Sequence, residues 1–127
     1  MIVADTDVLV DFLAGRGEHD RFVRDLIAGG QLRTTAINQF ELLAGARESR
    51  QLQRVETLIA GLEVLSITAG AAQEAASIQR MLLEAGQRIG AADCLIAGTV
   101  RWNKGSLLTR NKREFGRVPG LLIEITG

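Results

Sequence analysis

Acidic side chains that could hold a metal ion stand at widely separated points of the chain. Asp5, Glu41 and Asp93 each lie where an apolar run begins or ends, and a polar cluster follows at residues 109–115. Carboxylate oxygens are hard ligands, which suit Mg²⁺ or Mn²⁺. Carboxylates so far apart in sequence form a site only if folding gathers them, so the elements that carry them decide the question.

Gathered carboxylates indicate a particular chemistry. Carboxylates that are crowded together repel and raise one another's pKa unless a cation neutralises them. A divalent metal fills that role, lowers the pKa of a bound water and stabilises the charge that develops during phosphodiester hydrolysis. The pattern therefore predicts a metal-dependent nuclease or phosphatase.

The composition is that of one globular domain. The 127 residues are 46% hydrophobic and 24% charged, which is ordinary for a globular chain with a single core. We therefore expect one domain over residues 1–127. Fifteen basic and fifteen acidic residues give zero formal charge, so any RNA binding must be local. Basic residues that could contact phosphates cluster late in the chain: Arg101, Lys104, Arg110, Lys112, Arg113 and Arg117.

Cysteine and hydropathy indicate the compartment. Cys94 is alone, which excludes an intramolecular disulfide and suits a reducing cytoplasm. It lies in an apolar run far from His19, so a catalytic thiol is not expected. The chain shows no basic leader, and no apolar run approaches the roughly 18 residues of a membrane span. We expect a soluble cytoplasmic protein without membrane contact.

Strands and helices alternate along the whole chain. Short β-branched runs predict strands, and apolar residues at helical spacing between them predict helices, which argues an α/β sandwich with a mostly parallel sheet. The strands are expected at residues 2–4, 32–35, 62–67, 106–109 and 121–125. The helices are expected over residues 8–14, 18–28, 38–46, 49–60, 68–85 and 90–100.

This order of elements brings the polar residues together. In open parallel sheets, sites form at the carboxyl ends of the strands. Asp5 ends the first strand, and residues 109–111 end the fourth. Glu41 sits in the helix after the second strand, and Asp93 lies in the first turn of the helix that leads to the fourth. All of them are therefore expected at one edge of the sheet.

Each acid taken alone also has a simpler interpretation as a helix cap or a solvated charge. Asp7 precedes an apolar helix and is predicted to cap it, and Asp11 is interpreted as a surface charge. Glu41 fits this interpretation less well, because apolar residues flank it closely and a buried carboxylate needs a partner.

The chain resembles a known family, the PIN domains, and specifically the VapC-type ribonuclease toxins of toxin–antitoxin pairs. The resemblance covers the whole chain, and it rests on motifs in a fixed order. They are IVADTDVLVD at residues 2–11, TTAINQFELLAGA at 34–46, IGAADCLIAGT at 89–99 and LLTRNKREFGRVPGL at 107–121.

The resemblance implies a five-stranded parallel sheet of order 3-2-1-4-5 in an α/β/α sandwich, and a Mg²⁺ or Mn²⁺ endoribonuclease site. Asp5, Glu41 and Asp93 match the family's metal-binding positions. Further residues match its supporting positions: Thr6 after the first Asp, Thr109 and Asn111 in the T-x-N segment, and Glu114 where these toxins commonly carry Asp.

The resemblance also implies partners. Such toxins cleave structured RNA, often in tRNA or ribosomal RNA loops, form homodimers, and are neutralised by a VapB-like antitoxin whose tail lies across the early helices. Unpaired loops are suitable targets because splayed nucleotides can bring one phosphate to a recessed site.

Other functions stay open at this stage. The fold could serve as a non-catalytic module that binds RNA or a partner, with catalysis weakened by Glu114. Alternatively, Asp5-Thr6-Asp7 matches the D-x-D entrance of small-molecule phosphatases, in which the first Asp is a nucleophile. That class also needs a supporting Lys and a late acidic pair, whereas the late segment here offers single acids.

Overall fold

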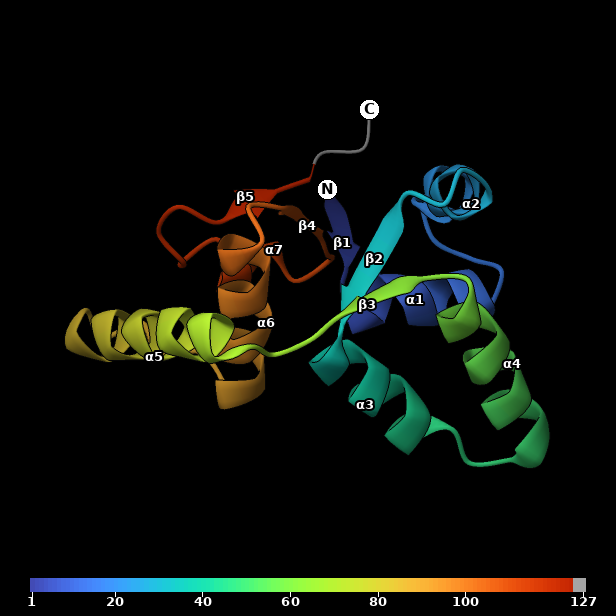
Figure 1. The fold of residues 1–127 in the computed structure, drawn as a ribbon, viewed down its shortest axis with the longest axis horizontal. Helices are drawn as coiled ribbons and strands as arrows, with labels where there is room; N and C mark the ends of the chain where they lie inside the picture. Colours follow the sequence, from blue (N-terminus) through green and yellow to red (C-terminus); the bar gives the residue numbers. More distant parts are fainter. Residues whose placement is uncertain (125–127) are drawn as a thin grey trace.

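A five-stranded parallel sheet forms the centre of the computed structural model, which describes residues 1–124 (Figure 1). The order β3-β2-β1-β4-β5 confirms the expected topology. The predicted final strand was 121–125, of which Ile125 lies outside the described residues. The strands are β1 (Ile2–Ala4), β2 (Leu32–Thr35), β3 (Glu63–Leu65), β4 (Ser106–Leu108) and β5 (Leu122–Ile123).

The expected helices are confirmed, with ends that shift by a few residues, and one short helix was not predicted. That helix, α7, has too few residues to show a helical period. In chain order the helices are α1 (Thr6–Leu13), α2 (Asp20–Ala28), α3 (Ala36–Gly45), α4 (Ser49–Ala60), α5 (Ala69–Glu84), α6 (Ala91–Trp102) and α7 (Lys112–Phe115).

Each face of the sheet has its own hydrophobic core. Neighbouring strand residues point to opposite faces, so Val3 and Leu107 pack with α5, α6 and α7, whereas Ala4 and Leu108 pack with α1 to α4. Buried residues of the first core include Ile78, Leu82, Ile96, Val100 and Phe115. Buried residues of the second include Val8, Leu9, Val23, Leu42 and Val55. The result is the predicted α/β/α sandwich.

The carboxyl edge of the sheet is where helices from both layers meet. Ala4 pairs with Leu108, so the next residues, Asp5 and Thr109, leave the sheet side by side. In Figure 1, α3 lies below the central strands with α1 at their lower right and α6 upright to their left, and α3 contacts both of these helices. None of the helices in residues 1–124 is long and apolar enough to cross a membrane.

A close helix crossing holds α6 in place against α5. A Cβ atom built on Gly98 would lie 2.6 Å from the backbone nitrogen of Ala75, and backbone cannot move aside as a flexible side chain can. Glycine at this position therefore lets the two helices approach more closely than any other residue would. Since α6 also carries Asp93, the crossing helps to place that carboxylate.

We predict that Gly98→Ala destabilises the protein by about 2 kcal/mol, because the added methyl overpacks the α5–α6 contact. Its melting temperature should fall by several degrees in a calorimetric scan. Gly45→Ala is the matched control: nothing lies within 4 Å of a Cβ there, so stability should stay equal or rise slightly. Equal melting temperatures for the two variants would contradict the close crossing.

Candidate active site

Asp5 lies at the centre of a hydrogen-bond network that joins separate parts of the chain. It is 7% exposed and caps α1. Its Oδ1 accepts hydrogen bonds from the Thr6 amide at 2.9 Å and from Asn38 Nδ2 at 3.0 Å. Its Oδ2 accepts a hydrogen bond from the Thr109 hydroxyl at 2.6 Å. These donors orient the carboxylate from α1, α3 and the end of β4.

Asn38 is a site residue that the sequence interpretation missed. It is fully buried and donates from Nδ2 to Thr6 Oγ1 at 3.0 Å as well as to Asp5. Its Oδ1 accepts a hydrogen bond from the Thr35 hydroxyl at 2.6 Å, within a capping box at the start of α3. The signal was present as Thr35-x-x-Asn38, a spacing that places a reciprocal cap at a helix start.

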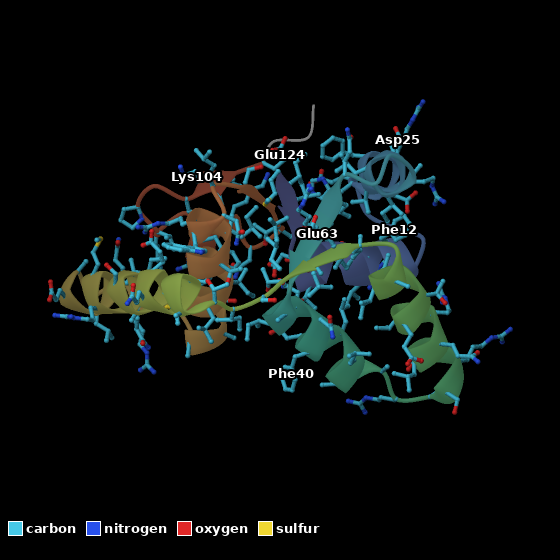
Figure 2. The ribbon with its side chains drawn as sticks, viewed as in Figure 1. Phe12, Asp25, Phe40, Glu63, Lys104 and Glu124 are labelled. Atoms are coloured by element: carbon cyan, nitrogen blue, oxygen red, sulfur yellow. The ribbon has the colours of Figure 1, made fainter. Side chains whose placement is uncertain are left out.

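Glu41 has a hydrogen-bond partner, as expected for a carboxylate that apolar residues flank in sequence. The Thr6 hydroxyl donates to Glu41 Oε1 at 2.6 Å, which links α1 to α3. The preceding residue, Phe40, does not bury the carboxylate: its side chain is 66% exposed and projects from α3 away from the sheet (Figure 2). Glu41 is therefore fixed by a polar contact rather than by surrounding apolar groups.

Asp93 carries the clearest electrostatic sign of a site. It lies in the first turn of α6, as predicted. Burial, followed by the charges of nearby carboxylates, raises its pKa to about 6. These carboxylates, in decreasing order of effect, belong to Asp5, Glu41, Glu114 and Asp7. The fold has therefore gathered the acids that the sequence scattered.

The segment after β4 closes the site. The Asn111 amide donates to Thr109 Oγ1 at 2.9 Å, so the hydroxyl that holds Asp5 also shapes the following turn. Asn111 precedes α7 without a capping hydrogen bond from its side chain. Glu114 lies 3.6 Å from an Arg117 guanidinium nitrogen, and its charge still contributes to the raised pKa of Asp93.

Two acidic residues behave differently from their interpretation as a cap and a surface charge. Asp7 does not cap α1, because Asp5 does; its carboxylate instead accepts the Arg110 amide at 3.2 Å, and burial followed by the Asp5 charge raises its pKa. Asp11 is not a surface charge. It is 9% exposed and lies between Arg16 and Arg110.

The thiol beside Asp93 is unsuited to nucleophilic chemistry, as expected. Cys94 is buried, and burial together with the Asp93 charge raises its pKa. A raised pKa keeps the thiol protonated near neutral pH, whereas the thiolate is the nucleophile.

The donor set suits a hard divalent cation, although the side chains are not arranged around one. Within residues 1–124, no three His, Cys, Asp or Glu side chains are placed so that they could hold a metal ion as they stand. Both Asp5 oxygens and one Glu41 oxygen are occupied by hydrogen bonds. The groups acting on Asp93 are nevertheless all negative or desolvating, which is the imbalance that a cation corrects.

An apolar groove runs beside the acidic cluster. It lies between α1, α3 and α4 and has a volume of about 260 Å³, with Glu41 at its wall. Val10, at 42% exposure, is the most open apolar side chain of α1 in it. The other lining residues are Leu13, Ala14, Leu42, Gly45, Ala46, Gln51, Arg54 and Val55.

This sheet order, with acidic residues from several elements at its carboxyl edge, is the architecture of the class expected from the sequence. The family model of the PIN domain matches residues 2–121. The chain therefore belongs to the PIN domain family.

Within that family the chain is similar to VapC proteins. It is 33% identical over 124 residues to the tRNA(fMet)-specific endonuclease VapC of Salmonella typhimurium. The aligned region covers 94% of this chain and 93% of that protein. It is 31% identical over 122 residues to ribonuclease VapC19 of Mycobacterium tuberculosis, with 95% and 97% covered.

Solved structures show the same fold. The DNA-bound VapBC of Salmonella typhimurium contains a chain that superposes with a TM-score of 0.87 at 32% identity, covering 97% of this chain and 96% of that one. A chain of VapBC2 from Rickettsia felis, bound to a promoter DNA fragment, superposes with a TM-score of 0.88 at 22% identity, and both chains are fully covered.

We predict that Asp93→Asn stabilises the metal-free protein at pH 7.5. The folded-state pKa of Asp93 is raised from 3.8 to about 6, so its ionisation costs stability as the pH rises through that window. Because Asp93 is partly exposed, screening reduces the gain to about 1 kcal/mol.

Thermal unfolding in EDTA measures this effect. The melting temperature of Asp93→Asn should exceed that of the unmodified chain by several degrees at pH 7.5 and match it near pH 4. A variant that is less stable at pH 7.5 would show that Asp93 has a favourable partner in the metal-free protein.

Proposed function

We propose that this chain is a cytoplasmic, single-domain, metal-dependent endoribonuclease of the VapC type. The observation that carries the proposal is the cluster of carboxylates around Asp93: burial and the neighbouring negative charges raise the pKa of Asp93 itself to about 6. Membership of the PIN domain family and the similarity to proteins named as VapC ribonucleases support the reaction class.

Asp5, Glu41 and Asp93 would hold Mg²⁺ or Mn²⁺, with Asn111 and Glu114 assisting at the rim. When bound, such an ion supplies an activated water and stabilises charge on the phosphate and the leaving oxygen. The chain's own supporting residues fix its ligands: Thr109 and Asn38 orient Asp5, and Thr6 orients Glu41. Outer hydrogen bonds of this kind set ligand direction and affinity.

The proposed substrate is structured RNA with an exposed loop, such as a loop of tRNA or ribosomal RNA. One similar protein is named as a tRNA(fMet)-specific endonuclease. A loop can present a splayed phosphate to carboxylates that lie at the end of a sheet. Aromatic residues make up 4% of the chain, so backbone contacts are favoured over extensive base stacking.

The proposed protein partners are a VapB-like antitoxin and a second copy of the chain. The structural neighbours include VapBC complexes, such as that of Salmonella typhimurium. The groove between α1, α3 and α4 offers an apolar surface next to the acidic cluster, which fits an antitoxin tail with apolar and basic side chains. Large exposed apolar residues elsewhere, including Phe40 and Trp102, are available for homodimer contacts.

We predict that the purified chain makes discrete cuts in total cellular RNA with Mg²⁺ or Mn²⁺ and none in EDTA. Asp5→Asn should reduce the cutting rate by about 100-fold or more, because it removes a ligand charge. The matched control is Asp25→Asn, which neutralises an exposed carboxylate on α2 and should cut as the unmodified chain does.

Each alternative function has its own result in this experiment. RNA binding without cutting in either metal would support the non-catalytic binding module. Hydrolysis of a small phosphate monoester without RNA cutting would support the phosphatase. Cutting by Asp5→Asn at the unmodified rate would refute the proposed site.

We also predict a short open reading frame for a VapB-like protein beside the gene for this chain, and a stable complex of the two products. Val10→Asp should weaken the complex about tenfold or more, because a charge would enter the apolar groove. Met81→Asp on α5 is the control, since Met81 is also 42% exposed but lies outside the groove. Equal affinities for the two variants, measured by calorimetric titration, would place the antitoxin elsewhere.

A further inference from the structure

The fold gives several of the basic residues that cluster late in the sequence different surroundings, while Lys112 and Arg113 lie exposed on α7. Arg101 donates to the Pro119 carbonyl and pairs with Glu74. Arg117 donates to the Arg88 carbonyl and lies near Glu114. Lys104 precedes β4, at the edge of the sheet opposite to the acidic site (Figure 2). Arg110 differs from these, since it lies two residues after the carboxyl end of β4.

Arg110 is anchored at both its backbone and its side chain. Its amide donates to the Asp7 carboxylate at 3.2 Å, and the preceding residue, Thr109, is bonded to Asp5. Its Nε lies 3.0 Å from Asp11 Oδ2, while 55% of the side chain remains exposed. The guanidinium is therefore held in a fixed place beside the acidic cluster, with part of it facing solvent.

Asp11 is built to hold that position. It is 9% exposed and has Arg16 Nε at 3.5 Å from its other oxygen. The loop after α1 closes over it: a Cβ at Gly17, where φ is +100°, would lie 3.1 Å from Asp11 Cβ. One carboxylate and two guanidinium groups leave a net positive charge at a rim that is otherwise acidic.

We infer that the Arg110 guanidinium binds a phosphate of the RNA strand next to the carboxylate site, and that Asp11 is the positioning residue that holds it there. The inference rests on the proposed endoribonuclease function. A planar guanidinium offers paired donors that match phosphate oxygens. Because Asp11 already restrains the side chain, less rotamer entropy is lost when the phosphate binds.

A salt titration of RNA binding tests this inference. The probe is a fluorescein-labelled 12-nucleotide uridine RNA, added to the full chain in EDTA so that metal-dependent cutting does not consume it. Each phosphate contact on single-stranded RNA contributes a slope of about 0.7 to the dependence of log affinity on log salt. Arg110→Gln should reduce the slope by that amount and weaken binding about fivefold or more, whereas Arg110→Lys should restore the slope.

Arg16→Gln is the matched control. It removes the same charge from a neighbour of the same carboxylate, but Arg16 lies on the loop after α1 rather than beside Thr109. Its slope should equal that of the unmodified chain. Equal losses in Arg110→Gln and Arg16→Gln would attribute the effect to general charge and overturn the inference, as would no loss in either.

A double-mutant cycle tests the role of Asp11. Asp11→Asn should weaken RNA binding at least threefold when Arg110 is present. The same substitution should leave RNA affinity unchanged in Arg110→Gln, because Asp11 acts through the Arg110 side chain. Additive effects would overturn the positioning role. The proposed function is tested separately by the cutting experiment: absence of RNA cutting by the unmodified chain in both Mg²⁺ and Mn²⁺ would contradict that function without bearing on these binding measurements.

Discussion

The rest of the site depends on the hydrogen bonds that the carboxylate of Asp5 accepts. Asp5 directly follows the central strand of a parallel sheet, and hydrogen bonds from Asn38 and Thr109 tie its carboxylate to the helix after β2 and to the turn after β4. Elements that are distant in sequence therefore share one anchor. The sheet register makes this possible, because Ala4 and Leu108 pair immediately before the two residues that meet.

This anchor concentrates negative charge, and the surroundings accommodate it in two ways. At the centre, Asp93 remains uncompensated, with a pKa of about 6 that reflects burial and repulsion; a divalent cation would relieve both. At the rim, Asp7 and Asp11 are satisfied by the backbone and side chain of Arg110. The same arginine is thus a structural partner of α1 and a positive group facing solvent beside the site.

Periodicity and turn residues predicted the strands and long helices, because each buries an apolar face with a regular repeat. The edge at which Asp5, Glu41 and Asp93 meet followed from the parallel topology. Contacts that depend on side-chain direction could not be predicted. The sequence predicts Asn38 only as the start of a helix and Asp11 only as a surface charge, because nothing local shows that Asn38 reaches Asp5 or that Arg110 reaches Asp11.

Binding of Mn²⁺, followed by electron paramagnetic resonance at pH 7.5, tests most directly whether these carboxylates form one cation site. We predict that the signal of free Mn²⁺ stays low until one equivalent has been added per chain, and that Asp93→Asn abolishes this binding. A free-ion signal that rises in proportion to total Mn²⁺ from the first addition, up to millimolar concentration, would contradict the site. Unchanged binding by Asp93→Asn would contradict its composition.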